Sequence, residues 1–235
     1  MIRLSKRLAV IAHYVPLGTV VADIGTDHAL LPSFLVQEKI SPAAVAIDVH
    51  EGPLEAARKQ VRALLLADKI SVRLGDGLEP LGENEIQTVV IAGMGGSTIV
   101  KILNKSPDIL KGLQRLILQP NIAAESLRSW ALDNNWQIVD EELVYEDGRY
   151  YEIIILEPGK MTLEDDIFLF LGEKLLDKFH PLLIDYLKNQ KRVEQEILHQ
   201  LEKSNSKDAQ EKANDILRKW IKVEQVIKWR LNVVI

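Results

Sequence analysis

Apolar residues in the first two thirds of the chain form short runs that alternate with segments of helical periodicity. Five of these runs have the length and β-branched content of strands buried on both faces: residues 20–22, 43–48, 70–74, 88–92 and 115–119. Amphipathic segments predict helices between them: residues 4–15, 29–37, 51–66, 96–103 and 125–134. This alternation predicts a doubly wound α/β sheet, whose ligands bind outside the carboxyl ends of the parallel strands.

The end of this α/β region has a different pattern. Residues 137–144 and 149–156 alternate like strands and flank Glu146-Asp147-Gly148, which predicts an antiparallel hairpin. An antiparallel hairpin added to a parallel sheet is typical of methyltransferases, whereas a plain dinucleotide domain ends on parallel strands. We therefore expect a Rossmann-like seven-stranded methyltransferase sheet with a terminal antiparallel hairpin.

No strand pattern returns after Glu157-Pro158-Gly159. The remaining segments predict three helices: residues 163–179, residues 181 to about 202 and, after a turn at residues 204–206, a last helix whose periodic positions run from Ala213 to Arg230. Apolar residues in the last two recur at alternating spacings of three and four, which predicts a short antiparallel coiled coil. The predicted domains are residues 1–159, an α/β domain, and residues 160–235, a helical domain.

The first predicted strand ends in an acidic loop with the pattern Asp23-x-Gly25-x-Asp27. A dinucleotide site has Gly-x-Gly-x-x-Gly at this place, because the backbone must approach a pyrophosphate. Two carboxylates repel phosphate but suit a ligand with cationic and hydroxyl groups. S-adenosylmethionine has a sulfonium, an ammonium and a ribose, so the loop favours a methyl donor over NAD.

Four segments together carry a family resemblance: Asp23-Ile24-Gly25-Thr26-Asp27-His28-Ala29, Gly75-Asp76-Gly77, Ala92-Gly93-Met94-Gly95-Gly96 and Leu118-Gln119-Pro120-Asn121. In this combination the chain resembles the bacterial tRNA adenine(22)-N1-methyltransferase family over nearly its whole length. The resemblance implies that residues 1–159 are a Rossmann-like catalytic domain that binds S-adenosylmethionine, and that residues 160–235 are a helical coiled-coil domain. This second domain either contacts tRNA or only stabilises or dimerises the protein. It also implies methyl transfer from S-adenosylmethionine to N1 of adenosine 22 in tRNA.

Acidic residues at two further strand ends are candidate donor ligands. Asp48 follows Asp23 by 25 positions, near the spacing of about 20 residues at which an acidic residue binds the ribose hydroxyls. Asp76 lies in a glycine turn with Gly77, where it would accept from the adenine amino group. The alternatives are that Asp48 only caps the next helix and that Asp76 only forms a turn.

The fourth predicted strand opens into the glycine-rich segment 93–96. Amino-directed adenine methyltransferases have Asp- or Asn-Pro-Pro-Tyr/Phe here, which accepts the exocyclic N–H. A glycine-rich wall instead offers backbone groups and room for a ring nitrogen that has no proton to lose, although it could also serve only to reverse the chain. We expect these residues to border the donor (Gly93, Met94) and the substrate (Gly95, Gly96, Pro120, Asn121).

The candidate catalytic residues are Asp27 and His28. Asp27 would stabilise the cationic product or accept an N6 proton, and His28 would relay it. Arg7 lies on the polar side of the first predicted helix and either contacts RNA or the donor, or is simply solvated. The target base must leave its stack, and Tyr14 and Tyr145 are alternative side chains for it to pack on.

Composition excludes several classes of protein. The chain of 235 residues has no cysteine and five scattered histidines, so we expect neither disulfides nor a metal site. Its net charge is −5, and residues 160–235 contain 14 Lys and Arg against 13 Asp and Glu, so RNA contacts must use local patches. The N-terminus is a poor signal peptide, and the longest uncharged run, residues 86–100, is shorter than the roughly 18 residues of a membrane span. We therefore expect a soluble, cytoplasmic protein.

Two other functions remain open at this stage. The chain could methylate another RNA or a small molecule, or it could be an RNA-binding protein that keeps the fold without turnover. An NAD-dependent dehydrogenase is disfavoured, because the chain has neither the glycine-rich fingerprint nor a Tyr-x-x-x-Lys sequence.

Overall fold

The chain is divided into two compact units in a computed structural model, which describes residues 2–204 and 206–235. Unit 1 comprises Met1–Thr162 and unit 2 comprises Leu163–Ile235, close to the boundary predicted at Gly159. Asn205, in the predicted turn before the last helix, lies outside the described residues. Each unit is described separately below.

Unit 1 is built on a seven-stranded sheet with the order β3-β2-β1-β4-β5-β7-β6. The first five strands are parallel, and β7 runs antiparallel to both β5 and β6. The order reverses between β1 and β4, which creates the switch point expected of a doubly wound sheet. The strands are β1 (Val21–Ile24), β2 (Ala44–Asp48), β3 (Ile70–Leu74), β4 (Thr88–Met94), β5 (Arg115–Pro120), β6 (Trp136–Glu146) and β7 (Arg149–Pro158).

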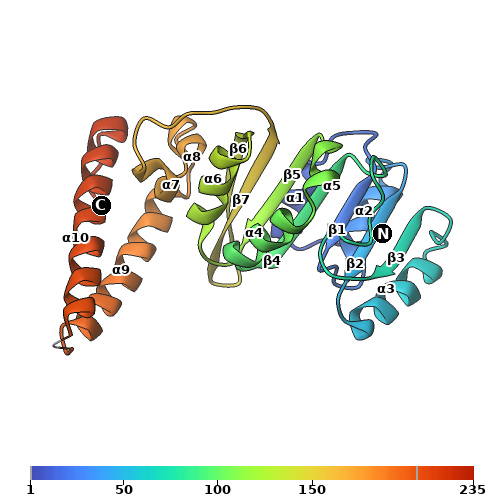
Figure 1. Ribbon diagram of the computed structural model, residues 1–235, viewed down its shortest axis with the longest axis horizontal. Helices are drawn as coiled ribbons and strands as arrows, with labels where there is room; N and C mark the ends of the chain where they lie inside the picture. The colour runs from blue at the N-terminus through green and yellow to red at the C-terminus, as the bar shows by residue number, and fades with distance from the viewer. Residues whose placement is uncertain (1, 205) are drawn as a thin grey trace. The chain divides into compact units, whose positions relative to one another are not determined.

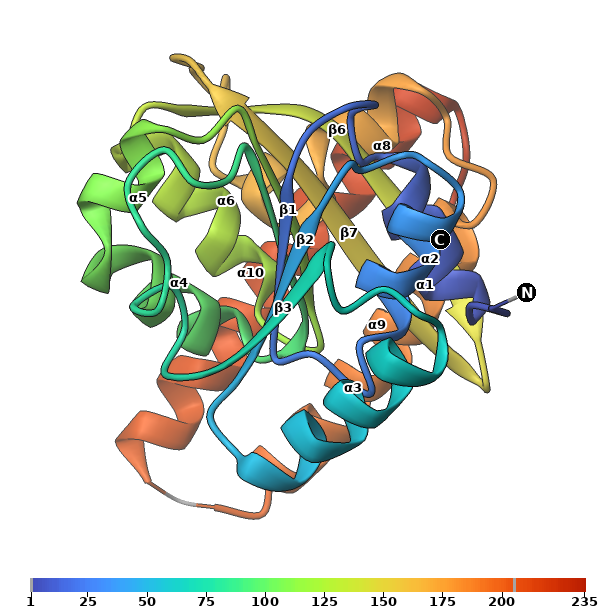
Figure 2. The ribbon, with the colours of Figure 1, turned by 90° about the vertical axis from the view of Figure 1, so that its right-hand side faces the viewer.

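Helices cover both faces of this sheet, which explains why its central strands are apolar on both sides (Figure 2). One face carries α4 (Gly96–Lys105), α5 (Pro107–Lys111) and α6 (Ala124–Asp133). The other carries α1 (Lys6–His13), α2 (Leu30–Gln37) and α3 (Glu51–Ala63). Alternate residues of one strand enter opposite cores: Val89 and Ile91 pack towards α4 and α6, whereas Val90 packs towards α1 and α2.

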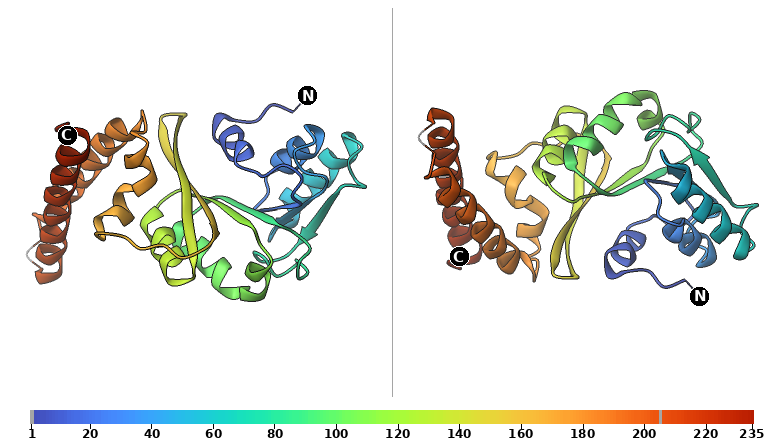
Figure 3. Two further views of the ribbon diagram at one scale, coloured as in Figure 1. Left: turned by 90° about the horizontal axis from the view of Figure 1, so that it is seen from above. Right: turned by 90° about the horizontal axis from the view of Figure 1, so that it is seen from below.

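The predicted terminal hairpin is confirmed, and it is longer than the sequence pattern indicated (Figure 3). Its turn residues Asp147 and Gly148 have φ of 49° and 76°, the left-handed conformations that a two-residue hairpin turn requires. Strand β4 also extends beyond its predicted end, because Gly93 forms a bulge between Ala92 and Met94. With φ of 81°, Gly93 adopts a conformation that favours glycine.

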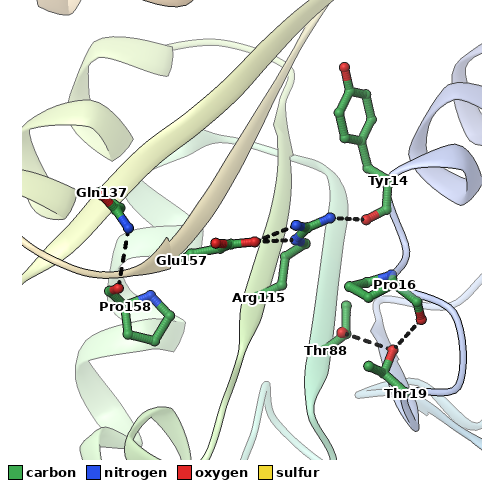
Figure 4. A network of polar contacts seen from close by, with 8 residues as sticks. All are labelled: Tyr14, Pro16, Thr19, Thr88, Arg115, Gln137, Glu157 and Pro158. Atoms are coloured by element: carbon green, nitrogen blue, oxygen red, sulfur yellow. Dashed lines mark hydrogen bonds and ion pairs between the residues drawn. The ribbon is translucent and has the colours of Figure 1, made fainter.

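Polar contacts join segments at the edge of the sheet where the parallel strands begin, which is the amino edge, opposite the switch-point loops (Figure 4). Arg115, at the start of β5, donates from Nε to Glu157 of β7 at 3.1 Å and from Nη1 to the Tyr14 carbonyl at 2.8 Å. The buried hydroxyls of Thr88 and Thr19 lie 3.2 Å apart. These contacts connect β4, β5, β7 and the end of α1 on the side away from the predicted ligands.

Unit 2 is entirely helical among its described residues. One long helix was predicted over residues 163–179, but this prediction is wrong: Gly172, with φ of 74°, separates two short helices. Two long helices follow and lie side by side (Figure 1). Ile216, Trp220 and Val223 of the second one are buried, as expected for the apolar positions of a coiled coil. The helices are α7 (Ile167–Leu171), α8 (Glu173–Asp177), α9 (Leu183–Leu201) and α10 (Lys207–Leu231).

Candidate functional site

A cavity of about 300 Å³ lies at the carboxyl ends of β1 to β4, beside α4. Of the seven residues predicted to bind the donor, five line it: Gly25, Asp48, Asp76, Gly77 and Met94. Asp23 and Gly93 are not in its wall. The other lining residues are Ile24, Ile47, Val49, Gly75, Thr98, Lys101, Ile102 and Lys105.

The loop after β1 is held against β2 by its backbone. The N–H groups of Gly25 and Thr26 both donate to the Ile47 carbonyl, at 2.8 and 3.0 Å. Gly25 has φ of 74°, and a side chain on it would collide with the Met94 methyl group. Glycine is thus favoured by the backbone conformation, whereas the Met94 methyl group, at the end of a flexible side chain, could move aside.

Asp23 is 8% exposed beneath this loop. Burial raises the pKa of its carboxyl group to about 6, because a charged carboxylate loses hydration in the interior. The Thr26 hydroxyl, although it makes no regular hydrogen bond among the described residues, and the positive charge of Arg7 both oppose this rise in pKa. Asp23 can therefore gain from a cation placed beside it.

Asp48 lies at the end of β2 in the cavity wall, and it does not cap α3, whose N-cap residue is His50. Its Oδ1 accepts from the His50 N–H at 2.8 Å, next to the start of α3. In the described part of the chain, its Oδ2 accepts no hydrogen bond. One oxygen thus orders the loop while the other remains for the hydroxyl groups of a ligand in the cavity.

Asp76 and Gly77 form the cavity wall after β3. Gly77 has φ of 58°, and a Cβ there would lie 2.7 Å from Cγ2 of Ile102, so a side chain would be strained and crowded. Asp76 Oδ2 pairs with Lys105 Nζ at 2.5 Å. This ion pair leaves Oδ1 as the free acceptor for an amino group, as far as the described residues show.

Asp27 and His28, the predicted catalytic residues, lie together in the exposed loop after β1 and are not in the cavity wall; His28 Nε2 is 3.3 Å from Asp27 Oδ1. Their side chains are 83% and 58% exposed. His28 and Ala29 have successive left-handed φ values of 55° and 49° immediately before α2. Such strain in residues other than glycine persists only where the surrounding structure enforces it, which is common at functional loops.

The glycine-rich segment after β4 combines an open part and a packed part. Nothing lies within 4 Å of a Cβ built on Gly93, which is exposed. A Cβ on Gly96 would collide with the Ala123 carbonyl, because the starts of α4 and α6 meet there. Gly96 is buried, so its lack of a side chain is explained by helix packing. Gly93 borders open space, whereas a Cβ on Gly95 would be in ordinary contact with Ile122 and Thr98.

A polar network joins α1 to the segments at the carboxyl ends of β4 and β5. Arg7 Nη1 donates to Gln119 Oε1, and the Arg7 guanidinium lies 5.2 Å from the centre of the Tyr151 ring. Gln119 Nε2 donates to the Pro120 carbonyl at 2.9 Å. Asn121 Nδ2 donates to the Gly93 carbonyl at 2.7 Å. Arg7 and Asn121, both predicted to contact substrate, are thus held by protein groups.

The sequence analysis missed the contribution of α4 to the cavity. Four of its residues, Thr98, Lys101, Ile102 and Lys105, line the cavity. Their spacing of three, four and seven places them on one helical face, a signal that the sequence did contain. The sequence analysis also missed Gln119 as the partner of Arg7, because nothing local indicates a contact between residues 112 positions apart.

No helix among the described residues is long and apolar enough to cross a membrane. Within residues 2–204 and 206–235, no group of three or more His, Asp or Glu side chains is arranged to hold a metal ion.

The sheet order, the terminal antiparallel hairpin and the cavity at the switch point together define a Rossmann-like S-adenosylmethionine-dependent methyltransferase. The family model of tRNA (adenine(22)-N(1))-methyltransferase matches residues 21–224. The chain belongs to this family. The resemblance, the fold class and the class of enzyme expected from the sequence are thereby confirmed.

Individual relatives agree with this assignment. The tRNA (adenine(22)-N(1))-methyltransferase of Bacillus subtilis is 44% identical over 158 residues, which cover 67% of this chain and 66%, just under two thirds, of that relative. The crystal structure of the B. subtilis enzyme has a TM-score of 0.87 at 33% identity, covering 97% of this chain and 100% of that one. M. capricolum TrmK, solved with S-adenosyl-homocysteine, has a TM-score of 0.78 at 34% identity, covering 94% and 98%.

Proposed function

We propose that this protein transfers the methyl group of S-adenosylmethionine to N1 of adenosine 22 in tRNA, and that it does so in the cytoplasm. The observation that carries the proposal is the cavity at the ends of β1 to β4, bordered on the β4 side by the open bulge at Gly93. One ligand can lie in this cavity while a second reaches its edge. The B. subtilis relative bears the name of this activity, which supports the choice of substrate.

The cavity suits the donor in size and in chemistry. Its volume of about 300 Å³ is at the lower end of the roughly 300–1,000 Å³ usual for small-molecule sites. Asp48 Oδ2 accepts from the ribose hydroxyls, and Asp76 Oδ1 accepts from the adenine amino group. Asp23, whose charge is disfavoured by burial, gains from the cationic end of the donor.

When bound, S-adenosylmethionine supplies an electrophilic methyl group. The protein must hold N1 in line with it and exclude water, since orientation supplies much of the rate. N1 of adenosine has no proton to lose, so no base is needed before the attack. Asp27, exposed in the loop after β1, stabilises the positive charge that develops on the methylated ring. His28, which lies beside it, positions the Asp27 carboxylate.

Unit 2 is the proposed second contact with tRNA. Its cations do not form a free basic stripe, because several are paired within the unit: Lys191 with Glu224, Lys219 with Glu194 and Lys222 with Asp165. Phosphates would have to compete with these carboxylates or use cations outside the pairs. If unit 2 contacts tRNA, deleting residues 163–235 should abolish tRNA methylation, while unit 1 should still bind the donor. Full activity of the shortened chain would contradict a role of unit 2 in tRNA binding.

Methylation of defined tRNA transcripts tests the proposed function. We expect the purified protein to modify a transcript with adenosine at position 22 and not one with guanosine there, as read by mass spectrometry of nuclease fragments. Methylation at another position, or of a small molecule only, would support the alternative methyltransferase functions. Tight tRNA binding without any transfer would support an RNA-binding protein that has lost turnover.

A further inference from the structure

The proposed function requires a surface on which the target adenine packs, and the structure distinguishes among the candidates. Tyr14 is excluded by its surroundings. Its hydroxyl lies 2.7 Å from Asp140 Oδ2 and 3.0 Å from Glu142 Oε1, and its carbonyl accepts from Arg115 at the amino edge of the sheet (Figure 4). Burial and the Asp140 hydrogen bond raise the pKa of Tyr14 well above its usual range, which fits a structural phenol.

Tyr145 is exposed but lies too far along the sheet. It pairs with Tyr150 at the end of the β6–β7 hairpin, with ring centres 4.7 Å apart. In the strand order, β6 lies three positions from β4, and neighbouring strands are about 4.8 Å apart. The reacting atoms must approach to roughly 3–3.5 Å at the end of β4. A base packed on Tyr145 would not reach that point without a large movement.

Ile122, the second residue after β5, lies in a loop next to the end of β4 and meets the requirement. It is an apolar residue that is 73% exposed. Its Cγ1 lies 3.8 Å from a Cβ built on Gly95, so it stands over the glycine-rich segment. Single exposed apolar residues are common, but this one lies where the second substrate must approach.

The backbone around Ile122 is held in place. The Ile122 carbonyl accepts from Gly96 N–H at 2.9 Å, and Asn121 N–H donates to the Met94 carbonyl at 2.7 Å. The Asn121 side chain bonds to the Gly93 carbonyl, and Ala123 has a left-handed φ of 58°. These bonds join the loops after β4 and β5 into one unit. Ile122 is thus an apolar side chain presented on a preorganised support.

We propose that Ile122 is the side chain against which the target adenine packs while N1 faces the donor cavity. This inference rests on the proposed function, because it names the residue that positions the substrate of that reaction. It also assigns Asn121 a supporting role: its amide fastens the two loops, and the neighbouring Ile122 contacts the base. A branched aliphatic face excludes water from the ring without making hydrogen bonds that compete with N1.

Single-turnover methylation with saturating donor and a series of tRNA concentrations tests the inference. Ile122→Ser should lower the maximal rate about ten-fold or more, since small losses of orientation slow the reaction strongly. Ile122→Phe should keep the rate within about three-fold of the original, because a ring offers the base a face. The affinity for S-adenosylmethionine and the melting temperature should not change. Leu17→Ser is the matched control, since Leu17 is 81% exposed and precedes β1, at the opposite edge of the sheet from the carboxyl ends of the strands.

Fluorescence separates base packing from a general structural effect. With 2-aminopurine at position 22 of the tRNA, the complex with the unmodified protein should be bright, because isoleucine does not quench a base that has left its stack. Ile122→Trp should quench the signal by stacking.

Two results would overturn the inference. One is an Ile122→Ser rate equal to that of Leu17→Ser, and the other is a large loss with Tyr145→Ser but none with Ile122→Ser. If the unmodified protein does not methylate adenosine 22 at all, the proposed function fails together with this inference.

Discussion

The two halves of the switch point use their polar groups in opposite ways. On the donor half, at the ends of β1 to β3, carboxylate oxygens of Asp48 and Asp76 remain available towards the cavity. On the target half, at the ends of β4 and β5, Gln119 and Asn121 bind other protein groups and leave Ile122 exposed. This difference supports our proposals that charge and hydrogen bonds hold the cationic donor, and that shape and apolar contact hold the neutral base.

The largest expected effect concerns Asp27, in the exposed loop after β1. If its carboxylate stabilises charge that appears only as N1 becomes cationic, Asp27→Asn should lower kcat by roughly 10²-fold. The dissociation constants of tRNA and donor should change little. Single-turnover methylation with both ligands saturating measures this effect. Asp68→Asn serves as the control, because Asp68 is exposed in a turn outside the cavity wall.

Either of two results would contradict this role of Asp27. A near-normal rate would show that the carboxylate is merely solvated. A loss confined to donor affinity would move Asp27 to the donor half.

The next largest effect concerns Asp23, the buried carboxyl group of the donor half. Because its pKa is raised to about 6, the folded protein keeps a proton that the unfolded chain releases near pH 4. The contribution of Asp23 to the free energy of unfolding therefore becomes less favourable as the pH rises from about 4 to 6, and stays so above that range. Asp23→Asn should stabilise the donor-free protein above about pH 6, by up to roughly 3 kcal/mol, and hardly at pH 4.

Urea unfolding at about pH 4 and pH 7.5 measures this difference. The exposed substitution Asp68→Asn should show no comparable dependence on pH. An equal gain from Asp23→Asn at both pH values would mean that the carboxyl group does not titrate in this range. The same variant should bind S-adenosylmethionine more weakly, because a stabilised neutral site lacks the charge that the donor needs.

Local patterns predicted the donor half well, because its ligands follow strands directly and the parallel arrangement brings their ends together. All seven strands were expected, and Asp48 and Asp76 lie in the cavity wall. The target half depends on pairings distant in the sequence, such as Arg7 with Gln119. Ile122 gave no signal, since an apolar residue after a strand usually belongs to the core. The break at Gly172 was missed for a similar reason: an isolated glycine in an apolar helical pattern is often tolerated.

A smaller effect is expected from Asp48, which both orders its loop and faces the cavity. Asp48→Ala should weaken S-adenosylmethionine binding by roughly 1–3 kcal/mol, because the ribose hydroxyls lose a charged acceptor. Asp48→Asn keeps an oxygen for the His50 N–H and removes only the charge. If both variants lose equal affinity in calorimetry, the charge matters. If only the alanine variant loses affinity, the role is ordering of the loop, and unchanged binding in both would exclude Asp48 from the site.

The smallest effect is expected from Lys105, whose ammonium pairs with Asp76 on the donor half. Both side chains are about half exposed, at 54% and 49%, so water and salt screen the pair. Lys105→Met frees the second oxygen of Asp76 and removes a positive charge beside a cationic ligand. Donor affinity should therefore increase, by less than about three-fold, and the increase should shrink at high salt.

Calorimetric titration of S-adenosylmethionine at low and high salt measures the effect of Lys105→Met. Lys111→Met is the matched control, because Lys111 also forms an exposed pair, with Asp108 at 2.7 Å, but does not line the cavity. A ten-fold weakening with Lys105→Met alone would make Lys105 a direct ligand of the donor. The donor half would then bind its ligand through a cation as well as through carboxylates. Helix α4, which carries Lys105, would then have to be counted among the elements that bind the donor.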